Sequence, residues 1–164
     1  FRYRPGWANA SIGRRSRVTA TEIRPIRDTD QAEWRRLWTL YLEFYESSVS
    51  EAVYATTFSR LLSSAENEFA ALIALVDGRP VGLAHYLFHR TCWRVENVCY
   101  LQDLYVDVSV RGTGLGRALI EAVYAKADEA GCPDVYWHTQ EFNAVGRRLY
   151  DRVARVTPFI VYER

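Results

Sequence analysis

The sequence predicts a mixed α/β domain in which a mostly antiparallel sheet is flanked by helices. Two apolar runs, 69–76 and 80–88, are separated by Asp77-Gly78-Arg79, and Asp-Gly supplies the positive φ angles of a tight hairpin turn. Apolar residues recur at helical spacing over 34–45, and a Gly-rich turn after Arg111 leads into a second periodic stretch. With 49% hydrophobic residues in 164, these patterns predict one folded domain over residues 21–164.

The first half of this domain is expected to be strand, helix, helix and hairpin. A short strand covers 22–26, and Asp28 is a good N-cap, with Gln31 as its capping-box partner, for a helix that continues through about Val49. A second helix covers 51–63. The stripe on the first helix predicts core side chains rather than a ligand site, and consists of Trp34, Leu37, Trp38, Tyr41, Leu42 and Tyr45.

The second half alternates strands and helices. A third strand covers 97–106, and a helix covers 114–130, ended by Gly131 and Pro133. A strand at 134–139, a helix at 143–153 and a last strand at 158–162 complete the chain. No internal repeat or linker divides the order β-α-α-β-β-β-α-β-α-β.

Residues 1–20 differ in composition from the rest. They carry five arginines and no acidic residue, although the whole chain has a net charge of only +1. That balance argues against a nucleic-acid or membrane partner, and we expect residues 1–20 to be a flexible basic arm. A nucleic-acid-binding tail is the alternative for this segment alone.

The cysteines and the hydropathy indicate the cytoplasm. Cys92, Cys99 and Cys132 are odd in number and scattered, which is not a disulfide framework and suits a reducing compartment. No apolar run approaches the roughly 20 residues that span a membrane, and residues 1–20 lack the apolar core of a signal peptide. The chain contains no Met, so we do not expect residue 1 to be the first translated residue.

The most informative segment is the turn from Arg111 to Gly116, Arg-Gly-Thr-Gly-Leu-Gly, which leads from a strand into a helix. Glycines let the backbone approach a ligand closely, and the first amides of a helix have no internal partners, so such a turn can bind a pyrophosphate. The alternative is a plain tight connection. A Walker loop is excluded because no Gly-Lys-Ser/Thr is present, and the third glycine comes one place too early for a dinucleotide fingerprint.

Arg-x-x-Gly-x-Gly resembles the acetyl-CoA signature of the GNAT (Gcn5-related) N-acetyltransferases. The segments 99–106, 135–139 and 143–150 also resemble, in order, the family's central strand, the strand that splays away from it in a V, and the helix that carries its Asn and Tyr. The closest motifs are those of diamine/polyamine and histone acetyltransferase-like members. The resemblance covers roughly residues 21–164.

The resemblance implies a binding mode for acetyl-CoA as cosubstrate. The backbone of Leu104, Tyr105 and Val106 would run beside the pantetheine arm, and Asn143 and Gly146 would lie near the pantetheine or thioester. The pyrophosphate would be held by the turn that comprises Arg111, Gly112, Thr113, Gly114, Leu115, Gly116 and Arg117.

The resemblance also implies direct attack of an amine on the thioester, without an acyl-enzyme. Such a site needs a neutral amine, a donor for the oxyanion and a proton for the departing thiolate. Tyr150 is expected to be the general acid, and an amide near Leu104, where the family's strand bulges, the oxyanion donor. Polyamine-type relatives carry Glu where this chain has Gln102, so the base is expected to be Asp103 instead, or Glu141.

The acceptor is therefore expected to be a small amine or a protein amine. Gln102 and Glu141 are the predicted substrate contacts. A non-catalytic acyl-CoA-binding or sensor domain is the alternative, suggested by Gln102. No metal is expected, since His85 and His89 share a strand face without further ligands. A homodimer is compatible with the family resemblance.

Overall fold

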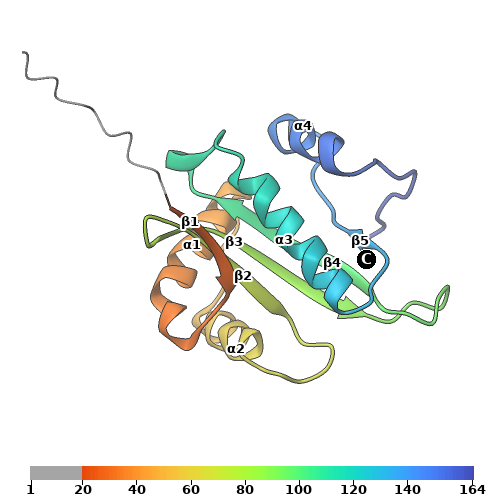
Figure 1. The fold of residues 1–164 in the computed structure, drawn as a ribbon, viewed down its shortest axis with the longest axis horizontal. Helices are drawn as coiled ribbons and strands as arrows, with labels where there is room; N and C mark the ends of the chain where they lie inside the picture. Colours follow the sequence, from red (N-terminus) through yellow and green to blue (C-terminus); the bar gives the residue numbers. More distant parts are fainter. Residues whose placement is uncertain (1–19) are drawn as a thin grey trace, which may run out of the picture.

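A computed structural model describes residues 20–164, so the predicted arm lies, except for Ala20, outside the described residues. The described chain forms a five-stranded sheet in the order β1-β2-β3-β4-β5 (Figure 1). The first four strands pair antiparallel and β5 pairs parallel to β4, which confirms the mixed, mostly antiparallel sheet. The strands are β1 Thr21–Pro25, β2 Ala70–Val76, β3 Arg79–His89, β4 Val98–Val106 and β5 Val135–Tyr136.

The predicted hairpin joins β2 to β3. Asp77 and Gly78 both take positive φ angles, 50° and 78°, as a two-residue turn of this kind requires. The turn brings two nearly continuous apolar strands side by side, and both are buried along most of their length. They form the centre of the sheet.

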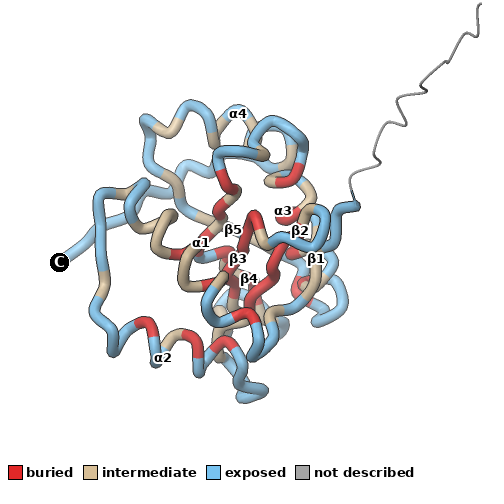
Figure 2. Tube along the Cα trace, turned by 90° about the vertical axis from the view of Figure 1, so that its left-hand side faces the viewer, coloured by how far each residue is buried: buried red, intermediate tan, exposed pale blue. Residues whose placement is uncertain are grey.

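Helices cover both faces of the sheet. Figure 1 shows α3 (Leu115–Glu129) on the near face and α1 (Gln31–Phe44) and α2 (Glu51–Leu61) behind it, while α4 (Ala144–Val153) stands beyond the β4–β5 edge. Each face has its own hydrophobic core: one packs the sheet on α3, and the other packs it on the aromatic side chains of α1 and α2. Figure 2 shows this buried material concentrated along the central strands.

The first helix differs from its prediction at both ends. Asp28 does not cap an α-helix but opens a 3-10 turn, Asp28–Asp30. Asp30 accepts hydrogen bonds from the Arg27 amide and from the two terminal guanidinium nitrogens of Arg24. The helix ends at Phe44 rather than near residue 49, because Glu46 takes a left-handed conformation (φ 52°) and the Ser47 amide turns back to Leu42.

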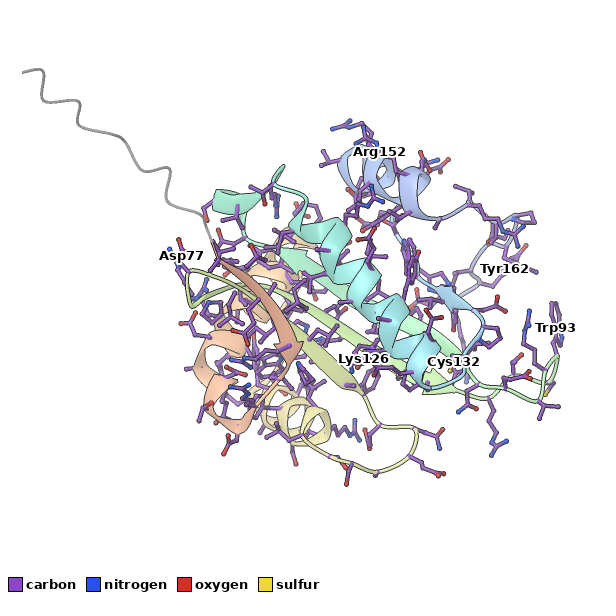
Figure 3. The ribbon with its side chains drawn as sticks, viewed as in Figure 1. Asp77, Trp93, Lys126, Cys132, Arg152 and Tyr162 are labelled. Atoms are coloured by element: carbon purple, nitrogen blue, oxygen red, sulfur yellow. The ribbon has the colours of Figure 1, made fainter. Side chains whose placement is uncertain are left out.

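The C-terminal part contains less strand than predicted. The strand expected at 134–139 is reduced to Val135–Tyr136, because the chain leaves β4 at that point. The last strand expected at 158–162 is absent, since this segment pairs with none of the described strands. Its apolar side chains are exposed, Tyr162 by 89%, and Figure 3 shows Tyr162 on the outside of the molecule.

Within residues 20–164 no helix has the length and apolar character that a membrane span requires.

Candidate active site

The Gly-rich turn lies between β4 and α3 and has an open face. Gly112 and Gly114 take positive φ angles, 79° and 89°, and a Cβ built on either would meet no atom within 4 Å. Gly114 is the N-cap of α3 and offers no side chain, and no hydrogen bond among the described residues uses the amides of residues 112–117. The first helical bond is from Ala118 to Gly114. The turn therefore presents unpaired donors to open space, which fits a pyrophosphate.

Each polar side chain of this turn makes a contact within the protein. Arg111 donates from Nε to the Val106 carbonyl at 2.9 Å and lies over the Tyr105 ring, while Arg117 pairs with Glu121 along α3 at 2.7 Å. The Thr113 hydroxyl donates to the Val110 carbonyl at 2.8 Å, which braces the turn. Each guanidinium group uses only its Nε in these bonds, so its terminal nitrogens remain, with the backbone amides, as donors for a phosphate.

The two strands beside this turn part from each other. β4 and β5 pair only at Cys99–Val135 and Tyr100–Tyr136, so the described strands leave the β4 edge open from Leu101 onward. This confirms the predicted splay. The expected bulge is also present but lies two residues earlier than expected, because the β3–β4 register skips Gln102 between Leu101 and Asp103. The extra residue turns Gln102 outward and places Leu101 and Leu104 on the same face.

A cleft occupies the space between the parted strands. One wall comes from the end of α1 and the other from the segment after β5 and from α4, while β4 forms the floor. Tyr150 from α4 thus lies across from the open β4 edge. The cleft is lined by Tyr41, Tyr45, Leu101, Gln102, Leu104, Trp137, His138 and Tyr150.

The position of Tyr150 depends on how α4 begins. Asn143 caps the helix, since its Oδ1 accepts the Gly146 amide at 3.0 Å, and its Nδ2 donates to the Thr139 hydroxyl at 3.0 Å. Gly146 leaves room for this cap, because a Cβ there would lie 2.6 Å from Asn143 Nδ2. Asn143 and Gly146, predicted to bind cofactor, therefore have a local role in holding α4.

Tyr150 itself packs edge-on against Trp137, with ring centroids 5.4 Å apart. Burial is the main cause that raises the pKa of Tyr150, and Tyr45 adds a smaller increase. The phenol therefore keeps its proton at neutral pH, as a general acid must. A thiol nucleophile is disfavoured by similar physics, since burial raises the pKa of Cys99 to about 12.

Asp103 lies behind the cleft, on the α1 side of β4. It is buried, and its Oδ2 lies 2.8 Å from Nδ1 of His85. Among the described residues no arginine or lysine forms an ion pair with it. Asp103 influences Tyr41, which lines the cleft. Burial is the main cause that raises the pKa of Tyr41 far above its usual range, and the charge and hydrogen bonding of Asp103 raise it further.

Sequence reasoning missed part of the cleft. The α1 stripe predicts core positions for Tyr41 and Tyr45. Tyr41 does pack against the core of α1 and α2, but both tyrosines also line the cleft. Trp137 and His138 fell inside a predicted strand. Glu141 is exposed and is not among the residues that line the cleft.

Comparisons with known proteins agree with this geometry. The model of the acetyltransferase (GNAT) family matches residues 34–154. The D-amino-acid N-acetyltransferase HPA3 of Saccharomyces cerevisiae is 40% identical over 143 residues, covering 87% of this chain and 89% of the yeast protein. The thialysine N-epsilon-acetyltransferase of Mus musculus is 29% identical over 147 residues, covering 81% of this chain and 82% of the mouse protein.

Solved structures share the fold. The aminoglycoside N-acetyltransferase AAC(6')-Iy in complex with CoA matches with a TM-score of 0.77 at 22% identity, covering 91% of this chain and 97% of that one. A ribosomal-protein-alanine N-acetyltransferase from Brucella melitensis matches with a TM-score of 0.70 at 23% identity, covering 88% and 98%. These matches, the open turn and the parted strands together define an acyl-CoA-dependent transferase. The chain belongs to the acetyltransferase (GNAT) family and is an acetyl-CoA-dependent N-acetyltransferase.

Proposed function

We propose that this enzyme acetylates the primary amine of a small molecule of the amino-acid or polyamine class, rather than a protein amine. The observation that carries the proposal is the cleft between β4 and the β5–α4 segment, which is walled on both sides by aromatic side chains. The 40% identical yeast relative, named for D-amino acids, supports a small acceptor. Gln102 lines the cleft and is the better supported substrate contact, whereas Glu141 lies outside it.

For the cosubstrate, we propose that the amides of residues 112–117 hold the pyrophosphate and that the open edge of Leu104, Tyr105 and Val106 flanks the pantetheine arm. The unpaired amides and the empty space in front of Gly112 and Gly114 support this arrangement. The thioester would then lie in the cleft near Leu104 and Tyr150. A backbone amide of β4 next to the Gln102 bulge would donate to the oxyanion.

The chemistry follows from these positions. The ammonium first loses one proton to Asp103, directly or through the Tyr41 hydroxyl. The neutral nitrogen then attacks the thioester carbon, so that a C–N bond forms and the carbonyl electrons move to oxygen. When the C–S bond breaks, the sulfur takes the proton of Tyr150, and the nitrogen's second proton restores that phenol through solvent. The products are the amide, the free thiol and one proton released to solvent.

The test is an amine screen that follows release of the free thiol. We expect D- and L-amino acids, diamines and thialysine to react with a kcat/KM at least about tenfold above that of peptides with a free lysine or N-terminus. An energy difference of about 1.4 kcal/mol gives that factor. Faster reaction with peptides would contradict the proposed acceptor. Binding of acetyl-CoA without thiol release for any amine would favour the sensor alternative.

Two further expectations stay predictions. The cytoplasm is supported by Cys92, Cys99 and Cys132, which are all free thiols in the structure. A homodimer is testable by sedimentation of the full chain. No nucleic-acid role is proposed.

A further inference from the structure

A row of buried hydrogen bonds runs from α1 through β3 to β4, directly behind the cleft. Trp34 donates from Nε1 to Nε2 of His85 at 2.8 Å, and His85 Nδ1 lies 2.8 Å from Asp103 Oδ2. The three residues are only 1%, 2% and 8% exposed. Burying polar groups costs free energy unless each has a partner, and apolar side chains would fill the same space without that cost. The row therefore needs a reason other than packing.

The chemistry of the indole gives the row a direction. A tryptophan nitrogen can only donate, so His85 must accept at Nε2 and carry its proton on Nδ1. The imidazole then donates to Asp103, which enters the row as an acceptor. Trp38 packs edge-on against His85, with ring centroids 5.7 Å apart, and the His85 ring is buried. The tautomer of His85 is thus set by Trp34.

The row ends at Asp103, and its neighbours in β4, Gln102 and Leu104, line the cleft together with Tyr41. The Asp103 charge contributes to the raised pKa of Tyr41, Tyr45 and Tyr100, for all of which burial is the main cause. Tyr41 is the one whose pKa is also raised by hydrogen bonding to Asp103, and it lines the cleft. A phenol can donate its proton to a carboxylate and at the same time accept an N–H of the substrate amine through its oxygen lone pairs.

We propose that Trp34 and His85 are positioning residues that fix Asp103, and through it the Tyr41 hydroxyl, as the acceptor site for the substrate amine. The proposal rests on the proposed function, because it assigns residues to the amine end of that cleft. Tyr41 would touch the amine itself. Trp34 and His85 would act only through the carboxylate, and Trp34 would do so from the far side of the core.

The structure offers a matched pair of variants to test it. Trp34 and Trp38 lie one turn apart on α1, stack at 5.2 Å, and both pack against His85. Only Trp34 donates to His85, while Trp38 Nε1 has no hydrogen-bond partner among the described residues. Replacing each by Phe therefore removes similar ring area from the same core, but only W34F breaks the row.

We expect W34F to raise the KM for the amine about fivefold to tenfold, the effect of one lost buried hydrogen bond. The KM for acetyl-CoA should stay within twofold of the wild type. W38F should leave both within twofold, and Y41F should raise the amine KM like W34F. Equal effects of W34F and W38F, or no effect of W34F and Y41F, would overturn the proposal.

A measurement on the unaltered enzyme does not depend on the folding of any variant. The ¹⁵N chemical shifts of the histidine rings report the tautomer, and the chain has three histidines to assign. The proposal requires neutral His85 with its proton on Nδ1, and the opposite tautomer would overturn it. If the wild type acetylated no amine, the proposed function would fail whatever the tautomer. Normal acetylation with identical W34F and W38F kinetics would reject this inference alone.

Discussion

Tyr150 is half-buried and lines the cleft. Its packing against Trp137 fixes the ring, so removing the hydroxyl alone should leave the cleft intact. We expect Y150F to lower kcat by about 100-fold, the low end of what a general acid contributes. The Kd of acetyl-CoA from calorimetric titration should stay within twofold. A variant with wild-type turnover would contradict the acid role.

The pH dependence of kcat offers a second check on Tyr150. Burial raises its pKa, and a general acid works only while protonated. As pH rises, the rate of the step that needs protonated Tyr150 should therefore stay constant until the pH passes the raised pKa of Tyr150, which lies above the ordinary tyrosine pKa of about 10. A fall of kcat centred below pH 10 that is present in the wild type and absent from Y150F would contradict this assignment.

At the scale of elements, the start of α3 is where the sequence is most informative. Gly114 has a positive φ and open space before it, so G114A would strain the turn and place a methyl group in the proposed phosphate site. We expect the Kd of acetyl-CoA to rise at least about tenfold, or 1.4 kcal/mol.

Gly131 is the matched control for Gly114. It also has a positive φ, 66°, and a Cβ added there would meet no atom within 4 Å, but it lies at the opposite end of the same helix. G131A should carry a similar backbone strain of about 1–2 kcal/mol and leave acetyl-CoA affinity unchanged. Equal losses of affinity in both variants would mean that strain alone is responsible.

The start of α4 makes a prediction about coupling. G146A would press a methyl group against the Asn143 amide, and N143A would remove that amide. Each single change should destabilise α4 by about 1 kcal/mol, the usual value of a helix cap, and lower kcat by displacing Tyr150. In the double variant, G146A should lower the free energy of unfolding by little more than N143A alone, because the Asn143 side chain that the new methyl group would meet is no longer present. Simple additivity of the two unfolding free energies, measured by urea titration, would contradict the shared role.

The same elements show how far sequence reasoning reaches. The hairpin and the Gly-rich turn could be predicted because short local patterns determine them: Asp77-Gly78 for the hairpin, and closely spaced glycines before a helix for the turn. The row formed by Trp34, His85 and Asp103 could not be predicted, since its members are far apart in the sequence and meet only when α1 packs on the sheet. The strand expected at 158–162 is absent, because a short apolar run does not by itself determine whether a segment pairs with a sheet.

At the scale of the whole molecule, the cleft forms because β4 and β5 part from each other while the hydrophobic core on each face of the sheet remains packed. The core under α3 and the core under α1 and α2 hold β2, β3 and β4 rigid, and α4 contributes no fully buried residue. The cleft therefore lies between a firmly packed part of the molecule and a lightly packed one. Lightly packed segments open at lower free-energy cost, so the α4 side is where ligands should change local stability most.

Acetyl-CoA should therefore protect one side of the molecule from hydrogen exchange. At 100 times its Kd a ligand stabilises the folded state by about 2.7 kcal/mol, and the Tm should rise by about 2–4 °C for each kcal/mol. Beyond this global effect, peptides that cover 104–117 and 139–153 should gain the most protection, because they carry the open β4 edge, the unpaired amides and α4. The α2 segment Glu51–Leu61 lies on the opposite face of the sheet and serves as the internal control. Equal protection of α2 and of 104–117 would contradict the placement of the cosubstrate.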